Sequence, residues 1–123
     1  MKKHMDIKYG KRILSNYLTQ LERYIVVTMD IPWKLCKHLF EENMPVQVVI
    51  IDTLDKETLD RLSCSFPKVN SIVGLGGGTA IDAAKYFAYL QDLTPILVPT
   101  ISSTNAPFSD FISIKKRWKC IWL

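Results

Sequence analysis

Residues 72 to 85 read Ile72-Val73-Gly74-Leu75-Gly76-Gly77-Gly78-Thr79-Ala80-Ile81-Asp82-Ala83-Ala84-Lys85. This pattern predicts a short apolar strand, a glycine turn, and a helix that begins at Thr79. Glycine allows a positive φ and leaves no Cβ between the main chain and a ligand. A helix that begins at such a turn points unpaired N–H groups and the positive end of its dipole at whatever lies over the turn. Phosphate is the usual occupant of this kind of site.

The glycine spacing differs from two common phosphate-binding motifs. Gly74, Gly76 and Gly78 do not complete G-x-G-x-x-G because position 79 is Thr, and no Lys-Ser or Lys-Thr follows at the Walker A distance. For the three consecutive glycines taken alone, a tight strand-to-helix turn without a ligand is the alternative.

The rest of the chain alternates between strand and helix patterns. Strands are predicted at 5–9, 24–29, 46–51, 71–75 and 95–99, and helices at 11–22, 30–43, 55–62 and 79–91. Leu35 is expected on the apolar side of the second helix, and Asp55 or Thr53 is expected to cap the third. The small residues Ala80, Ala83 and Ala84 should let the last helix lie close on the sheet. The runs at 24–29 and 46–51 are rich in β-branched residues and apolar on both faces, as in parallel strands that helices cover on either side. The order therefore predicts a single α/β domain with a Rossmann-like, doubly wound parallel sheet.

Several polar or glycine-rich segments follow directly after predicted strands. They are Asp30, Asp52, residues 76–78 and residues 100–105. Ligands of doubly wound sheets bind outside the carboxyl ends of the strands, near the point where the strand order reverses. We therefore expect these segments to meet at one edge of the sheet and to form the functional site.

One family resemblance rests on two quoted strings together. The first is Gly76-Gly77-Gly78-Thr79-x-x-Asp82-x-x-Lys85, and the second is Pro95-Ile96-Leu97-Val98-Pro99-Thr100-Ile101-Ser102-Ser103-Thr104-Asn105-Ala106-Pro107. Together they resemble the nucleotide domain of the iron-containing alcohol dehydrogenase superfamily, over about residues 5 to 114. The segment 102–107 is most similar to the glycerol and glycerol-1-phosphate dehydrogenase branch. The resemblance implies an NAD(P)-binding domain over residues 1–114.

The glycine turn and the following helix supply the first candidate site residues. The backbone of Gly76, Gly77, Gly78 and Thr79 is expected to hold the pyrophosphate of NAD or NADP, and the Thr79 side chain adds a contact or caps the helix. Asp82 either stabilises the positive helix end or contacts the cofactor. Lys85 lies three residues later, at the spacing of an ion pair with Asp82.

Two further loops supply the remaining candidates. Asp30 can accept hydrogen bonds from ribose hydroxyls and repel a 2′-phosphate, which favours NAD; capping of the next helix is the competing interpretation. By similarity, the hydroxyls of Thr100, Ser103 and Thr104 reach toward the cofactor and Asn105 toward a polyol substrate. Many relatives have Asp where Asn105 stands, and an ordered polar loop without a ligand is the alternative.

The resembled dehydrogenases also use a divalent metal, zinc or iron, held by an acid and two histidines of a helical second domain. This chain contains only His4 and His38, and both precede the nucleotide motifs. We therefore expect the helical domain to be absent, the metal not to bind this chain, and the chain to be inactive alone. Residues 115–123 lack the family's glycine turn and are predicted to be an aberrant tail from a premature stop or shifted frame. A terminal strand is the alternative, and an apolar end of this kind favours self-association.

Composition excludes several function classes. The chain has 123 residues, 48% apolar and 23% charged, and its net charge of +4 lies largely in basic ends. No aromatic pattern accompanies those ends, so a nucleic-acid partner is not expected. Three cysteines without C-x-x-C, no membrane-length apolar run and no signal peptide predict a cytoplasmic protein that does not contact membranes.

Three functions fit these observations. The first is a truncated nucleotide-binding domain of a metal-dependent, NAD(P)-linked dehydrogenase of glycerol or glycerol 1-phosphate. The second is a non-enzymatic nucleotide-binding or interaction module. The third is a fragment similar to dehydroquinate synthase, which the loop at 103–107 fits less well. The substrate, the preference between NAD and NADP, and the oligomeric state stay open.

Overall fold

The computed structural model describes residues 5–9, 11–100 and 118–122. The elements are β1 (Met5–Tyr9), α1 (Lys11–Leu18), β2 (Tyr24–Thr28), α2 (Asp30–Cys36), the 3-10 helix η1 (Lys37–Phe40), β3 (Gln47–Ile50), α3 (Lys56–Cys64), β4 (Ser71–Gly76), α4 (Gly78–Gln91), β5 (Pro95–Pro99) and β6 (Trp118–Trp122). The alternation of strands and helices expected from the sequence is confirmed.

The strands of the described residues form one six-stranded parallel sheet in the order β1-β6-β5-β4-β2-β3. After β2 the chain moves outward to β3, returns past β2 to β4, and continues away from it to β5. The winding direction therefore reverses between β2 and β4. This arrangement is the predicted doubly wound sheet, with its switch point between those two strands.

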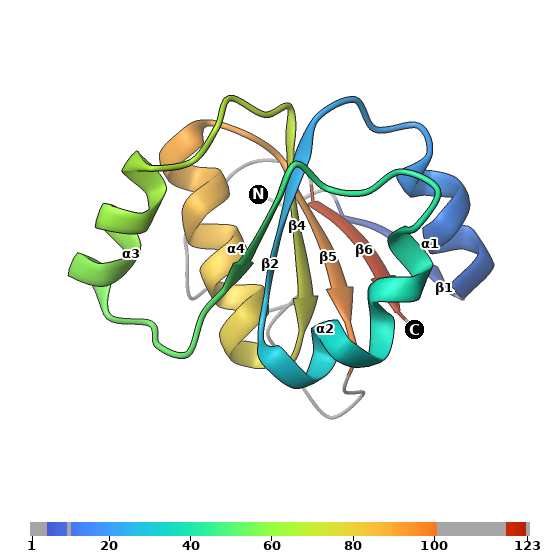
Figure 1. Ribbon diagram of the computed structural model, residues 1–123, viewed down its shortest axis with the longest axis horizontal. Helices are drawn as coiled ribbons and strands as arrows, with labels where there is room; N and C mark the ends of the chain where they lie inside the picture. The colour runs from blue at the N-terminus through green and yellow to red at the C-terminus, as the bar shows by residue number, and fades with distance from the viewer. Residues whose placement is uncertain (1–4, 10, 101–117, 123) are drawn as a thin grey trace.

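Helices cover both faces of the sheet. Figure 1 shows α3 and α4 on one side, while α1 and α2 lie on the other. Side chains of β2 divide accordingly: Ile25 and Val27 pack in the core under α3 and α4, whereas Tyr24 and Val26 pack in the core under α1 and η1. All five residues of β2 are buried because the strand is covered on both faces and paired on both edges.

Two expectations about the segment 30–51 were wrong. The predicted buried strand at 46–51 is the edge strand β3, with Val49 buried but Gln47 and Ile50 exposed. An apolar sequence cannot reveal that a strand has a neighbour on one side only. The helix predicted to run to residue 43 instead ends at Cys36 and tightens into η1, and Leu35, expected on its buried side, is 69% exposed.

The expectation of an exposed apolar end is contradicted at one residue of the last described strand, Ile121. β6 lies between β5 and β1, in register with both, and its Ile121 is 2% exposed. The structure forms a strand over Trp118–Trp122, and the origin of residues 115–123 stays a prediction. Ile121 is thus part of the core under α1 and not of a surface available for self-association.

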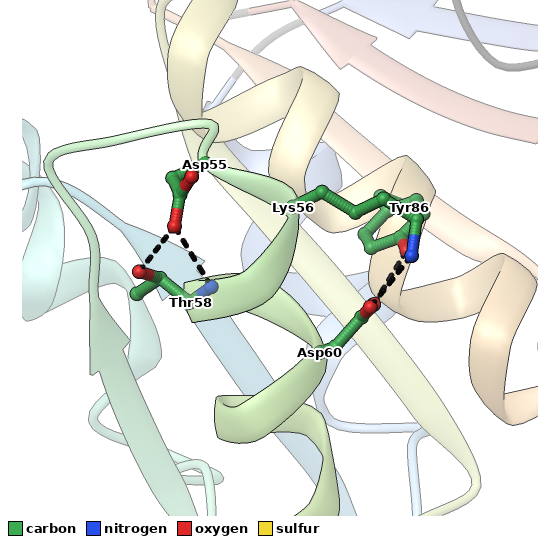
Figure 2. Close-up of polar contacts among 5 residues, drawn as sticks. All are labelled: Asp55, Lys56, Thr58, Asp60 and Tyr86. Atoms are coloured by element: carbon green, nitrogen blue, oxygen red, sulfur yellow. Dashed lines mark hydrogen bonds and ion pairs between the residues drawn. The ribbon is translucent and has the colours of Figure 1, made fainter.

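Polar contacts cap α3 at its start and, separately, join it to α4, as Figure 2 shows. Asp55 is the N-cap of α3, as one of the two predicted caps, and its Oδ2 accepts hydrogen bonds from the Thr58 N–H at 3.0 Å and the Thr58 hydroxyl at 2.7 Å. One turn later, Asp60 pairs with Lys56 at 2.7 Å and accepts a hydrogen bond from the Tyr86 hydroxyl of α4.

The Asp55 cap predicts a pH-dependent loss of stability. The hydrogen bonds from Thr58 hold the pKa of the Asp55 carboxyl below its ordinary value. Its contribution is therefore present above the unfolded pKa of about 3.9 and is lost as pH falls through the lower folded pKa. Replacing Asp55 with alanine should lower the melting temperature at neutral pH, and this difference should shrink at about pH 2.5.

The control is Asp55→Asn, because asparagine also caps helices but does not ionise in this range. Thermal melts at both pH values should place Asp55→Asn near the wild type at neutral pH. A gap between wild type and Asp55→Ala that stays constant down to acid pH would contradict the prediction.

Candidate functional site

The carboxyl ends of the parallel strands bring the predicted site segments to one edge of the sheet. Asp30 begins α2 just after β2, Gly77 follows β4, and Thr100 follows β5. Figure 1 shows α2 and α4 beginning at the edge toward which the arrows of β4 and β5 point. The Thr100 N–H donates to the Gly76 carbonyl oxygen at 3.1 Å, which ties the end of β5 to the glycine turn. The expected convergence at the switch point is therefore confirmed for these residues.

Gly76 is the position in the turn where only glycine fits without strain. Its φ is +136°, which L side chains rarely adopt. A Cβ added there would lie 3.3 Å from the Cβ of Ala80 and 3.3 Å from the Cγ of Pro32. Pro32 belongs to α2, so the start of α2 lies directly against the glycine turn. The segments that follow β2 and β4, the two strands at the switch point, are therefore in contact at Gly76.

Gly77 is the N-cap of α4, with φ −88° and ψ −162°, and no side chain caps the helix there. The helix begins at Gly78, one residue earlier than predicted, so Thr79 lies inside its first turn. The interpretation of Thr79 as N-cap was therefore wrong. At 14 residues, α4 is long enough to carry a dipole, and its first N–H groups are available to an anion.

Gly74 sets how closely α4 lies on the sheet. A Cβ at Gly74 would come within 2.5 Å of the Cβ of Ala84, so the helix rests directly on the strand backbone. Ala80, Ala83 and Ala84 are all completely buried, which confirms the prediction that small residues let this helix approach closely. This approach places the start of α4 immediately beyond the end of β4.

Asp82 and Lys85 form the predicted ion pair. The Lys85 Nζ lies 3.6 Å from Asp82 Oδ1, beyond hydrogen-bond length, and the Lys85 side chain is completely buried. Asp82 Oδ1 is itself buried and has no hydrogen-bond partner within the described part of the chain. Burial raises the pKa of the Asp82 carboxyl, and Lys85 opposes that rise. A buried carboxylate oxygen without a donor, one turn into α4, fits a site that a ligand completes.

Asp30 does not cap α2. The N-cap is Met29, no side chain caps the helix, and Asp30 is its first residue. The Asp30 carboxylate instead pairs with Lys34 at 3.2 Å, and both side chains are about 70% exposed, at 70% and 69%. The capping alternative was therefore wrong, and the carboxylate remains accessible at the edge of the sheet.

Three residues that shape the site were not among the sequence candidates. Thr28, completely buried at the end of β2, donates its hydroxyl to the Leu75 carbonyl oxygen at 2.7 Å and so links β2 to the residue before Gly76. Pro32 packs on Gly76, and Lys34 pairs with Asp30. Only the pair of Lys34 with Asp30 could have been predicted from the sequence, because an acid four residues before a lysine commonly forms an ion pair on a helix.

Ser103, Thr104 and Asn105 lie outside the described residues. Within residues 5–9, 11–100 and 118–122, no three His, Cys, Asp or Glu side chains come together as a metal site would require. Nor does any helix in those ranges have the length and apolar character needed to cross a membrane. Among the described residues, the N–H groups that could hold an anion are those at the start of α4.

Comparison with known proteins agrees with this geometry. The sequence model of the iron-containing alcohol dehydrogenases matches residues 15–120, which is most of the chain and includes the whole glycine turn. The chain belongs to the iron-containing alcohol dehydrogenase family. The family resemblance inferred from the two sequence strings is thereby confirmed.

Curated relatives of this iron-containing alcohol dehydrogenase family member include two kinds of polyol enzyme. A glycerol-1-phosphate dehydrogenase [NAD(P)+] of Saccharolobus islandicus is 31% identical over 116 residues, covering 89% of this chain and 33% of the relative. A glycerol dehydrogenase of Citrobacter freundii is 50% identical over 38 residues, covering 31% of this chain and 10% of the relative. The chain thus spans about a third of the Saccharolobus enzyme.

Solved structures share the fold. Glycerol dehydrogenase from Schizosaccharomyces pombe superposes with a TM-score of 0.78 at 21% identity, over 97% of this chain and 37% of that one. Maleylacetate reductase from Agrobacterium tumefaciens has a TM-score of 0.72 at 14% identity, over 99% of this chain and 41% of that one. At these identities the likeness establishes the Rossmann-like architecture alone.

Proposed function

We propose that this chain binds NAD or NADP, with the pyrophosphate over the turn from Gly76 to Thr79. The observation that carries the proposal is the start of α4, which no side chain caps, beside a glycine at φ +136°. The N–H groups of Gly78 and Thr79 are placed to donate to a phosphate oxygen, and the helix dipole favours the negative charge. No other group in the described residues competes for that position as a side-chain cap.

The remaining candidates have supporting roles in this proposal. Asp30, accessible at the switch point beside the glycine turn, accepts from the hydroxyls of the adenosine ribose. Asp82 accepts from the cofactor through its buried, unbonded oxygen. Thr100 sits at the end of β5, bonded to Gly76, and leads into the segment that contains Ser103, Thr104 and Asn105. We assign Ser103 and Thr104 to the cofactor and Asn105 to a polyol substrate by family similarity.

For the whole protein we propose an NAD(P)-linked polyol dehydrogenase. The named activities of the Saccharolobus and Citrobacter relatives support glycerol 1-phosphate or glycerol as the substrate class. When bound, the nicotinamide would supply hydride chemistry, and the described residues would hold the pyrophosphate and the adenosine ribose of the cofactor. Because the chain spans about a third of the Saccharolobus enzyme, we assign the alcohol-binding and metal-binding steps to no described residue.

A pair of substitutions at Gly77 tests the phosphate cradle separately from folding. Aspartate and serine are both good N-cap residues, and the extended φ and ψ of Gly77 suit either, so both should preserve or stabilise α4. Only aspartate brings a negative charge to the phosphate position. Isothermal titration should therefore show saturable NADH binding to the wild type, weakened by roughly a hundredfold or more in Gly77→Asp and by less than about tenfold in Gly77→Ser.

Circular dichroism of both variants would verify that they are folded. Equal losses in Gly77→Asp and Gly77→Ser would assign the effect to side-chain bulk and not to charge. If the folded wild type binds neither NADH nor NADPH, the glycine turn has an architectural role only and the proposed function is wrong.

A further inference from the structure

Asp30 and Lys34 form an ion pair near the start of α2. The proposed function, on which this inference rests, places the adenosine ribose of the dinucleotide beside this pair. Lys34 Nζ is 3.2 Å from Asp30 Oδ2. Asp30 is two residues before Pro32, whose ring packs against Gly76. Asp30 therefore begins α2 at the carboxyl end of β2, the strand beside β4 and its glycine turn, which is the position of the ribose-binding acid in nucleotide-binding sheets. Lys34 lies one turn further along α2.

NAD and NADP differ at this point by one phosphate group. An acid here accepts from the 2′-hydroxyl of NAD and repels the 2′-phosphate of NADP, whereas a nearby cation accommodates that phosphate. A site with aspartate alone should be strongly selective for NAD. In this chain a lysine pairs with the aspartate, so its positive charge offsets part of that repulsion.

The pair can rearrange at small cost. Both side chains are about 70% exposed, and exposed ion pairs of this kind hold their geometry weakly. Lysine has a flexible stem and a compact ammonium group with three donors, which suits a phosphate oxygen. α2 has only seven residues, so the charge at this position comes from the two side chains and not from the helix terminus.

We propose that Lys34 is a specificity-determining residue that lets the site accept NADP as well as NAD. With NAD bound, Asp30 accepts from the ribose hydroxyls while Lys34 stays beside it. With NADP bound, Lys34 turns from Asp30 to the 2′-phosphate and screens that phosphate from the carboxylate. Acceptance of both cofactors is thus a property of this pair of residues and does not require a change in the glycine turn.

The test compares NADH and NADPH titrations of the wild type, Lys34→Met and a matched control, Lys37→Met. Methionine keeps much of the length of lysine without its charge, and Lys37 is also exposed, one turn further on in η1. Lys34→Met should weaken NADPH binding by roughly fivefold to tenfold and leave NADH binding within about twofold. Lys37→Met should change neither by more than about twofold. Asp30→Asn should strengthen NADPH binding and weaken NADH binding.

Salt provides an independent readout. Because the Lys34 contribution is an exposed charge interaction, the NADPH affinities of wild type and Lys34→Met should converge as ionic strength rises from about 0.05 M to about 0.5 M. A wild type that binds NADH but discriminates against NADPH by more than about a hundredfold would overturn the inference. So would a ratio of NADPH to NADH affinity that Lys34→Met leaves unchanged. If the folded wild type binds neither NADH nor NADPH, the proposed function is overturned as well. This result differs from one in which NADH binds and only the role of Lys34 fails.

Discussion

Gly74→Ala is expected to destabilise the protein by about 2–4 kcal/mol, a large part of the stability of a domain of this size. The added Cβ would lie 2.5 Å from the Cβ of Ala84, a distance that real side chains do not tolerate. Neither partner has a side-chain torsion that could relieve the contact. α4 must therefore move away from β4, which loosens the packing of Leu97 and the buried alanines and displaces the start of the helix.

A second substitution can establish that the contact with Ala84 is the cause. Ala84→Gly removes the opposing methyl group and costs about 1 kcal/mol by itself, because glycine is a poor helix former. In the double variant, Gly74→Ala should recover about 1–3 kcal/mol relative to the sum of the single effects. Urea denaturation followed by circular dichroism gives the free energies of unfolding.

The matched control combines Gly74→Ala with Ala83→Gly. Ala83 lies on the same helix and is equally buried, but it is not among the nearest contacts of Gly74. This pair should be additive within about 0.5 kcal/mol. Additivity in the pair with Ala84 as well would show that the close approach of helix and strand does not limit stability.

Gly76→Ala should lower the free energy of unfolding by about 2–3 kcal/mol and also weaken NADH binding by at least roughly tenfold. Two costs act together. Alanine is strained at φ +136°, and its Cβ would press on Ala80 and on Pro32 at 3.3 Å. Relief of that pressure moves either the first turn of α4 or the start of α2, and both border the proposed phosphate position.

Gly77→Ala is the appropriate control, because φ at Gly77 is −88°, which alanine adopts without strain. Its loss of stability should stay within about 1 kcal/mol, although alanine is a weaker N-cap than serine. Chemical denaturation and NADH titration of both variants make the comparison. A Gly76→Ala protein as stable as Gly77→Ala would mean that the backbone of the turn relaxes to negative φ at little cost.

Local sequence patterns predicted the elements well where the deciding forces are local. The β-branched run at 24–28, the Asp55 cap and the small residues of α4 all report directly on backbone preference, capping or close packing. Local patterns did not predict the strand order or the exposure of residues that follows from it. β3 contains the same kind of residues as β2, and only its place at the edge of the sheet explains why Ile50 is 48% exposed.

For the candidate site, too, the sequence predicted some features and not others. Convergence of Asp30, Gly77 and Thr100 follows from parallel strands alone, so the sequence could predict it. The roles of individual side chains depend on atomic geometry that spacing does not determine. Asp30 and Thr79 both have good capping chemistry, yet the N-caps are Met29 and Gly77, because the backbone leaves its extended conformation one or two residues earlier. The Thr28 hydrogen bond to Leu75 joins strands 47 residues apart and has no sequence signature.

The position of β6 between β5 and β1 has a consequence for the order in which this domain assembles. β1 pairs only with β6 in the described sheet, and the register joins Met5 to Trp118, almost the two ends of the chain. During synthesis β1 therefore has no partner among the described strands until residues 118–122 have left the ribosome. The central strands β2, β4 and β5 can pair earlier, and closure of the long loop between β1 and β6 follows them, at an entropic cost that grows only slowly with loop length.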